Sequence, residues 1–384
     1  MKICVITDGY PTPVDPGTFV FVDQLVSAWA DQGTDVSVIY PIPFFVELFD
    51  KKRFYKSVWE KKTLKGSTIK VFSPRLFRVA DKKIGFLETR DLSYHSFQRA
   101  VERTIKKLPV EPDALYGHFL PAGCHAGDIG QRMDIPAFCA FGESSLWSIE
   151  GNDMEKTRNS LSKLTGMVSV SSENKRVLID EHLYREKDIE VFPNGVDHSL
   201  FRPQNKKEIR AKHGFPENAF IGIYTGSFNQ DKGVLRAQEA AIRSGNTFMI
   251  YIGGGQLKPE GENILFQGRL SHDKLPEYLS AADFFILPTK AEGCCNAIVE
   301  AIACGLPVVS ANGAYNDDIL TDEYSIRTDP EDITAMAEAI RILRDNPDRR
   351  ERMAQAAGKA SLKFDIEQRA SAILDFMKRK QQER

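Results

Sequence analysis

The sequence predicts an α/β protein with two doubly wound, parallel-sheet domains, and three observations support this. Short apolar runs rich in β-branched residues alternate with segments of helical period along nearly the whole chain. These runs are apolar throughout, which is typical of strands covered by helices on both faces. The length of 384 residues suggests two domains or three, at about 150 residues each. Ligands of such sheets bind beyond the carboxyl ends of the strands, so the site is expected in the loops that follow them.

Ten apolar runs are expected to form strands, joined through helices in right-handed βαβ units. In chain order they are Lys2–Thr7, Val36–Tyr40, Asp113–Tyr116, Pro136–Phe141, Met167–Val170, Ile189–Phe192, Phe220–Thr225, Thr247–Ile252, Asp283–Leu287 and Pro307–Ser310.

Two C-terminal segments carry the signals of a helix start followed by a buried stripe. In the first, Asp329 can cap the helix and Pro330 suits the first helical position. Apolar residues then recur at helical spacing as far as Leu343. In the second segment, Asp365 is the expected cap, and the apolar stripe extends to Met377.

A break in the strand pattern predicts the domain boundary. The pattern restarts at Phe220, after the segment Pro193–Asp197 and a polar stretch. We therefore expect an N-terminal domain of residues 1–194 and a C-terminal domain of residues 195–364. Two such domains leave a cleft between them, which is a common place for ligands.

Composition indicates a protein of the cytoplasm and gives no reason to expect nucleic acid as a partner, because the net charge is only −2. The six cysteines form no C-x-x-C pair, and free thiols are typical of a reducing compartment. No secretory signal is evident, and no apolar run approaches the roughly 18 residues of a membrane span. Contact with the inner face of a membrane stays open.

The most informative stretch runs from Glu292 to Val309. It contains an expected helix that opens after Gly293 and ends at Gly305. The free N–H groups and positive dipole end of such a helix suit a diphosphate. Glu292 before the helix and Glu300 about two turns inside it could accept hydrogen bonds from sugar or ribose hydroxyls. Alternatively, Glu292 only favours the helix dipole and Glu300 is a solvated helix residue.

The same stretch resembles the E-x7-E signature of retaining nucleotide-sugar glycosyltransferases with two Rossmann-like domains facing across a cleft, the GT-B architecture. More narrowly, it is similar to glycosyltransferase family four. Further segments occur in the family's order: Val191–Asp197, Phe201–Pro203, Gly226–Gly233, Gly253–Gly255, Phe266–Leu270 and Ala281–Asp283. The resemblance also implies that the last helix, residues 365–384, returns to pack on the N-terminal domain.

The resemblance implies a donor site in the C-terminal domain. Glu300 would bind the donor ribose, and Glu292 would interact with the transferred sugar. The distal phosphate would meet the backbone of the helix start, formed by Cys294, Cys295, Asn296 and Ala297. Leu270 would lie beside the base, which backbone groups recognise, and a UDP-sugar is expected in preference to a GDP-sugar.

Cations are needed to stabilise the departing diphosphate, because the resemblance implies an enzyme that uses no metal. Lys232 matches the family's lysine, although a surface lysine is the ordinary alternative. Ser227 stands where the family has an arginine, so Arg269 or Arg236 would have to compensate.

Three residues of the N-terminal half are similar to family positions near donor and acceptor. Gly17 lies in a loop that resembles the family's glycine loop, or it serves only a tight turn. His118 fits a histidine segment at a strand end, where a structural role is the alternative. After the strand Pro136–Phe141 the family often has a histidine, whereas this chain reads Gly-Glu-Ser-Ser. Glu143 is then the candidate acid/base or sugar contact.

A resident metal and a cofactor are not expected, because the histidines are scattered and no Asp-x-Asp pair occurs. Residues 51–83 hold twelve Lys or Arg against two acids, with aromatic residues interleaved or adjacent. The range 44–83 therefore suits peripheral contact with an anionic membrane, where lipid-linked acceptors reside. The alternative is a solvated region whose aromatic side chains pack into the domain.

The predicted function is transfer of a sugar from a nucleotide sugar to a glycan or lipid-linked acceptor in bacterial polysaccharide or glycolipid biosynthesis. Two alternatives share the architecture: a sugar-nucleotide epimerase or hydrolase that uses Glu143 and His118, and a nucleotide-binding relative without activity. A nicotinamide dehydrogenase is disfavoured, because no G-x-G-x-x-G follows the first strand.

Overall fold

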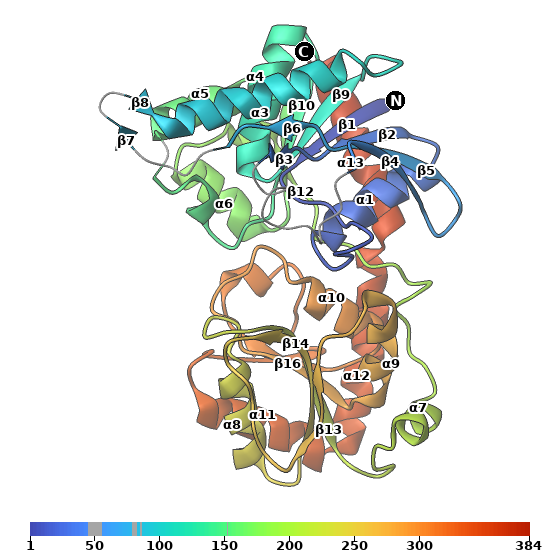
Figure 1. Cartoon of the computed structure of the whole chain (residues 1–384). Coiled ribbons are helices and arrows are strands. Elements are labelled where there is room, and N and C mark those ends of the chain that lie inside the picture. The colour runs from blue at the N-terminus through green and yellow to red at the C-terminus, as the bar shows by residue number, and fades with distance from the viewer. Residues whose placement is uncertain (45–55, 79–82, 85–86, 152) are drawn as a thin grey trace. The chain divides into compact units, whose positions relative to one another are not determined.

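The computed structural model of the chain describes residues 1–44, 56–78, 83–84, 87–151 and 153–384, which form two compact units (Figure 1). The N-terminal unit comprises Met1–Val170, Asn174–Phe192 and Ala370–Arg384. The C-terminal unit comprises Ser171–Glu173 and Pro193–Arg369. Each unit contains its own parallel sheet.

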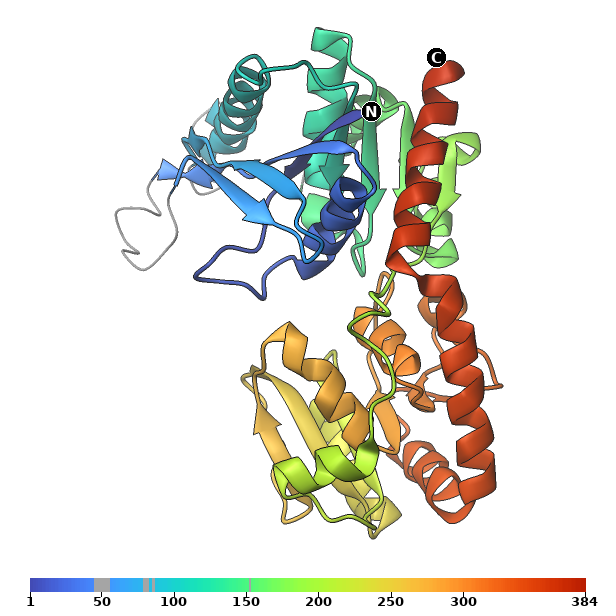
Figure 2. The same ribbon diagram turned by 90° about the vertical axis from the view of Figure 1, so that its right-hand side faces the viewer.

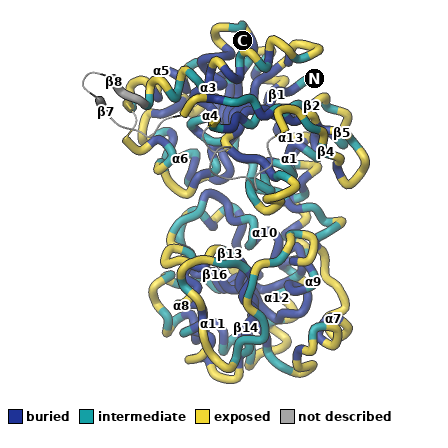
Figure 3. The backbone as a smooth tube through the Cα atoms, viewed as in Figure 1, coloured by how far each residue is buried: buried dark blue, intermediate teal, exposed yellow. Residues whose placement is uncertain are grey.

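The N-terminal unit is built on an eight-stranded sheet in the order β12-β11-β10-β9-β1-β2-β5-β4. All neighbours pair in parallel except β4, which runs antiparallel to β5 at the edge. Strands β9 and β10 are buried along their whole length, as strands covered on both faces should be (Figure 3). The strands are β1 (Lys2–Thr7), β2 (Asp35–Ile39), β4 (Val58–Lys62), β5 (Thr68–Phe72), β9 (Ala114–His118), β10 (Ala137–Phe141), β11 (Gly166–Ser169) and β12 (Ile189–Val191).

Helices of this unit cross between the strands and cover the sheet. They are α1 (Val20–Asp31), α3 (Thr89–Ile105), α4 (Leu120–Met133), α5 (Met154–Ser162) and α6 (Ser172–Asp180, from Asn174 onward). Two small sheets pair β3 (Ile42–Pro43) with β6 (Arg75–Leu76) and β7 (Lys83–Ile84) with β8 (Leu87–Glu88).

The last helix, α13 (Ile366–Gln382), contributes its residues from Ala370 onward to the N-terminal unit, alongside the strands (Figure 2). The indole of Trp29 donates a 2.9 Å hydrogen bond to the Ala370 carbonyl. The ring of Phe376 packs 6.2 Å from that of Phe138. Gly166 leaves room for this ring, because a Cβ there would lie 2.8 Å from Phe376.

The C-terminal unit has a six-stranded sheet in the order β15-β14-β13-β16-β17-β18, parallel throughout. The order reverses at β13, which lies between β14 and β16, and ligands of open parallel sheets bind at such a switch point. The strands are β13 (Ile221–Phe228), β14 (Phe248–Gly255), β15 (Ile264–Gly268), β16 (Phe284–Leu287), β17 (Val308–Ala311) and β18 (Ser325–Thr328).

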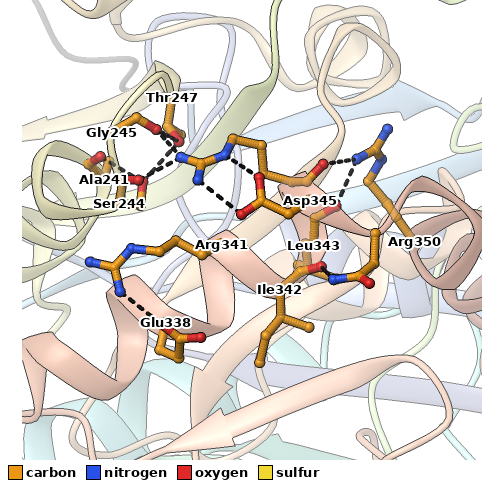
Figure 4. Close-up of polar contacts among 12 residues, drawn as sticks. Ala241, Ser244, Gly245, Thr247, Glu338, Arg341, Ile342, Leu343, Asp345 and Arg350 are labelled. Atoms are coloured by element: carbon orange, nitrogen blue, oxygen red, sulfur yellow. Dashed lines mark hydrogen bonds and ion pairs between the residues drawn. The ribbon is translucent and has the colours of Figure 1, made fainter.

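Six α-helices accompany this sheet: α7 (Lys206–His213), α8 (Val234–Ser244), α9 (Leu275–Ala281), α10 (Asn296–Ala303), α11 (Ile333–Asp345) and α12 (Pro347–Ser361). Polar contacts join the end of α8 to α11 (Figure 4). The guanidinium of Arg344 donates to the carbonyls of Ser244 and Gly245, and Arg350 donates to the Leu343 carbonyl at 2.6 Å. These contacts anchor the C-terminal end of α8 to α11. The N-terminal end of α8 follows the loop after β13.

The ten expected strands are present. The short strands β3, β6, β7 and β8 of the two small sheets were missed, as were four strands of the two large sheets: β4, β5, β15 and β18. These strands lie near sheet edges and carry polar or half-exposed residues, so they lack a continuous apolar run. The predicted start of α11 was also wrong. Asp332 caps this helix by accepting from the Ala335 N–H at 2.9 Å, whereas Asp329 caps only the preceding turn. Asp365 does cap α13, as expected.

Candidate active site

The loops that follow β13 and β16 bring Lys232 and Glu292 together at the carboxyl edge of the C-terminal sheet. Since β13 and β16 are neighbours, their loops emerge side by side. The ammonium of Lys232 donates a short hydrogen bond to the Glu292 carboxylate, forming an ion pair. Burial lowers the pKa of Lys232, but the Glu292 charge outweighs this and raises it above its usual value. The amine is therefore a cation that Glu292 holds in place, and its side chain is only partly exposed.

The Lys232 loop is held rigidly against the strand ends. Gly233 has a φ of +74°, and a Cβ there would lie 2.6 Å from the Pro288 carbonyl oxygen. The Lys290 N–H donates to the Asp231 carbonyl at 2.9 Å, which joins the two loops. Lys232 is thus positioned by the backbone on both sides.

The two candidate replacements for the missing arginine differ in what they contact. Arg236 donates to the carbonyls of Gln230 and Pro288 at 2.7 and 2.8 Å, so its guanidinium braces the loops. Arg269 is exposed and lies over Gly254, where a Cβ would come within 2.6 Å of its Nε. Gly254 pairs with Ser227 in the sheet register. Arg269 therefore lies beside the strand position where the arginine is absent.

Helix α10 begins at the expected place, with Cys295 as the N-cap and no side chain capping the first N–H groups. Asn194 fixes the preceding loop, because its N–H contacts the Cys294 sulfur at 3.2 Å and its side-chain amide donates to the Cys294 carbonyl at 3.0 Å. Asn296 and Ala297, in the first turn, are partly exposed. Burial raises the pKa of both thiols, that of Cys294 to about 12, so neither cysteine is a reactive thiolate.

Glu300 is buried, so the alternative of a solvated helix residue is wrong. Its carboxylate lies 2.8 Å from Nε2 of His272, which follows β15. Burial lowers the pKa of His272, but the hydrogen bond and charge of Glu300 outweigh it and raise the pKa above its usual value. Sequence reasoning missed His272 because it missed β15, and with it the loop that follows this strand. Leu270 lies in the same loop and is half-buried.

His118 ends β9 and is buried among aromatic rings of the N-terminal unit. The Phe21 and Phe119 rings lie 5.4 and 4.8 Å from its imidazole. Phe119 has a φ of 52°, a conformation that non-glycine residues rarely adopt and that concentrates at functional sites. The sequence did not single out these two phenylalanines. Gly17 is exposed, with nothing within 4 Å of a Cβ placed on it, so no steric contact requires glycine there.

Glu143 lies in the loop that follows β10, and its buried carboxylate reaches the start of α4. Its carboxylate accepts hydrogen bonds from the Leu120 N–H at 3.0 Å, the Ser148 hydroxyl at 2.8 Å and the Gly142 N–H at 3.2 Å. Burial raises its pKa to about 7, against the opposing effect of these donors. The carboxyl therefore titrates near neutrality while it holds the segment that carries His118 and Phe119.

The described residues contain no group of three or more His, Cys, Asp or Glu side chains arranged to hold a metal ion. None of the helices in the same part of the chain has both the length and the apolar character needed to cross a membrane.

Two family models divide most of the chain between them. Residues 17–200 match the model described as Glycosyltransferase Family 4, and residues 205–360 match that of Glycosyl transferases group 1. The chain is a family-four glycosyltransferase. The E-x7-E pair lies within the second match, at the start of α10.

The names of two relatives of this glycosyltransferase point to glycan assembly. TuaC of Bacillus subtilis, a glycosyltransferase named for teichuronic acid biosynthesis, is 26% identical over 359 residues and covers 88% of each chain. An Escherichia coli UDP-Gal:alpha-D-GlcNAc-diphosphoundecaprenol alpha-1,3-galactosyltransferase is 29% identical over 179 residues, covering 42% of this chain and 46% of its own.

Solved structures show the same GT-B fold. Sucrose-phosphate synthase from Thermosynechococcus elongatus superposes with a TM-score of 0.77 at 16% identity, covering 98% of both chains. Anabaena HepE in complex with UDP has a TM-score of 0.73 at 16% identity, covering 98% of this chain and 100% of its own. At such identities the likeness concerns the fold alone.

Proposed function

We propose that this glycosyltransferase is a retaining, metal-independent enzyme that transfers a sugar from a UDP-sugar to a glycan or lipid-linked acceptor. The observation that carries the proposal is the Lys232–Glu292 ion pair beside the open helix start of α10. A fixed cation and unpaired N–H groups at one sheet edge supply the charge stabilisation that a departing diphosphate needs.

Each residue has a distinct task in this proposal. Lys232 and the first turn of α10 bind the diphosphate, with Arg269 as the second cation. Glu292 orients both Lys232 and the transferred sugar. Glu300, held by His272, accepts hydrogen bonds from the ribose hydroxyls.

The proposed reaction keeps the configuration at the anomeric carbon. An acceptor hydroxyl forms the new C1–O bond on the face that the diphosphate leaves, as the old C1–O bond breaks. The hydroxyl proton passes to the departing phosphate oxygen. His118 and Glu143, of the N-terminal unit, are the candidates to contact the sugar and the acceptor.

The names of related proteins support the choice of substrates. HepE was solved with UDP and with UDP-glucose, and the E. coli relative uses a UDP-sugar and a diphosphoundecaprenol-linked acceptor. TuaC points in the same direction, towards polymer biosynthesis.

Thermal unfolding with UDP-, GDP- and ADP-sugars, in the presence of EDTA, tests the donor site. A ligand at about 100 times its dissociation constant adds roughly 2.7 kcal/mol of stability, which raises the melting temperature by several degrees. We expect a UDP-sugar to stabilise the wild type but neither Glu300→Ala nor Lys232→Ala. No shift with any nucleotide sugar contradicts the donor-site assignment.

Product analysis tests the reaction itself. Transfer with retention gives a glycoside whose anomeric proton has the donor's configuration by NMR. Conversion of the sugar nucleotide without acceptor indicates an epimerase or hydrolase instead, and binding without turnover indicates a non-catalytic relative.

Peripheral contact with an anionic membrane through residues 44–83 is part of the same proposal. Of that range, residues 45–55 and 79–82 lie outside the described residues. Among the described aromatic side chains, Phe44 is exposed, whereas Trp59 packs 6.2 Å from the ring of Tyr10. Co-sedimentation with phosphatidylglycerol vesicles at low salt tests the contact, and equal recovery in the supernatant with and without vesicles ends it.

A further inference from the structure

Strand β6 lies beside α3 in the N-terminal unit (Figure 1), and residues of both line a concave surface. We call it the α3 groove and define it by six of its lining residues: Arg75, Phe77, His95, Arg99, Arg103 and Lys107. Its volume is about 710 Å³, which is within the range of pockets that bind small molecules. None of the residues assigned to the donor or acceptor lines it.

Three cations form one wall of the α3 groove. Arg99 and Arg103 lie on successive turns of α3, about 6 Å apart along the helix axis, and Lys107, four residues further on, lies in the turn that follows the helix. All three side chains are exposed. No described carboxylate lies within ion-pair distance of any of them.

The acids near this wall are engaged by other cations. Glu102, on the same helix, pairs with Arg132. Asp91, at the end of the groove, lies 3.6 Å from the ammonium of Lys156. The positive charge of the groove is therefore not neutralised by its own helix.

The opposite wall comes from β6 and is held in place by hydrogen bonds. The guanidinium of Arg75 donates to the Ser73 carbonyl at 3.1 Å, and the Phe77 N–H donates to the Ser96 hydroxyl of α3 at 2.9 Å. Phe77 is 48% exposed and presents an apolar ring among the cations. The groove is thus preformed, with positive charge on both walls.

We propose that the α3 groove binds an anionic glycan, a sugar chain bearing carboxylate or phosphate groups. Cations at regular spacing can pair with successive anionic groups of an extended chain, while an exposed aromatic ring can pack on the apolar face of a pyranose. Cations on two facing walls can contact both sides of an extended glycan chain. A flat bilayer would instead contact a convex surface, so the concave shape favours a glycan over a membrane. This binding does not depend on the proposed transfer reaction.

The test measures binding of the full chain to a defined oligogalacturonate, with maltoheptaose as the neutral control, by calorimetry at low salt. The groove variant is Arg99→Glu/Arg103→Glu/Lys107→Glu. The matched control, Arg349→Glu/Arg352→Glu/Lys359→Glu, makes the same charge change at exposed positions of α12 in the other unit.

We expect the wild type to bind the oligogalacturonate but not maltoheptaose, with affinity falling as salt rises. The groove variant should bind at least about tenfold more weakly, and the α12 variant should bind nearly as the wild type does. Arg103→Gln, a milder change, should weaken binding without loss of the melting transition.

Four results would overturn the proposal. Equal losses in the groove and α12 variants would show a general charge effect. Unchanged binding in a folded groove variant would place the site elsewhere. Absence of binding by the wild type would show that the chain does not bind this glycan. Loss of phosphatidylglycerol vesicle binding in the groove variant, with glycan binding intact, would assign the groove to the membrane.

Discussion

His272 and Glu300 form a buried contact of 2.8 Å that joins the loop after β15 to helix α10. Glu300 comes from the E-x7-E signature, whereas His272 comes from a loop that lies 28 residues earlier in the chain. The histidine leaves one carboxylate oxygen for a ligand. It therefore fixes the orientation of the side chain assigned to the donor ribose.

The first prediction concerns the pH dependence of this contact. Because the His272 pKa is raised in the folded chain, the charged pair contributes stability below the ordinary histidine pKa near 6.5, and loses it as pH rises through the folded value. The stability difference between wild type and His272→Gln should therefore shrink as pH rises from 6 to 9. Urea unfolding across this range measures it, and a constant difference would contradict the ion pair.

The second prediction concerns Lys232. Lys232→Met should weaken UDP binding by at least about tenfold, because it removes a fixed cation and leaves the Glu292 charge unpaired. Calorimetric titration with UDP measures the effect. Lys290→Met is the matched control, since Lys290 lies in a neighbouring loop but pairs with Glu331 at 2.7 Å. Equal losses of UDP affinity in both variants would mean that Lys232 acts only through the overall positive charge of this region and not through direct contact with the diphosphate.

The third prediction concerns the missing arginine. Arg269→Ala should weaken UDP binding by about 1 kcal/mol or more, because this guanidinium lies over Gly254 beside Ser227. Adding Ser227→Arg should restore the affinity by returning a cation to the same strand ends. Lys258→Ala, an exposed cation just after β14, should have no effect. If the double variant does not regain UDP affinity, an arginine at position 227 cannot replace Arg269, and the two positions serve different roles.

The fourth prediction separates two roles of Glu143. Its folded pKa of about 7 lies above the ordinary value of 4.5, so ionisation destabilises the folded chain as pH rises between these values. Glu143→Gln should gain stability relative to the wild type from pH 5 to pH 8, as urea unfolding would show. A carboxyl that only positions the start of α4 should allow the glutamine variant to keep most of its kcat, whereas an acid/base group should not.

Much of the donor site could be predicted from local sequence. Glu292 lies in the loop before α10, Glu300 lies inside this helix, and Lys232 follows the strand β13. A strand, a turn and a helix therefore suffice to place them. The apolar runs likewise predict the central strands, because burial on both faces leaves a continuous pattern. Edge strands such as β15 leave no such pattern, and His272 was missed with it.

The sequence alone determined the fold class, the family and the residues of the signature, since these depend on periodicity and spacing within short segments. Only the tertiary structure decided which partners these side chains have. Lys232 meets Glu292 because β13 and β16 are neighbours in the sheet, and Glu143 became a buried support of α4 because β10 ends beside that helix. Such pairings depend on strand order and burial, which bring together residues 60 or 23 positions apart.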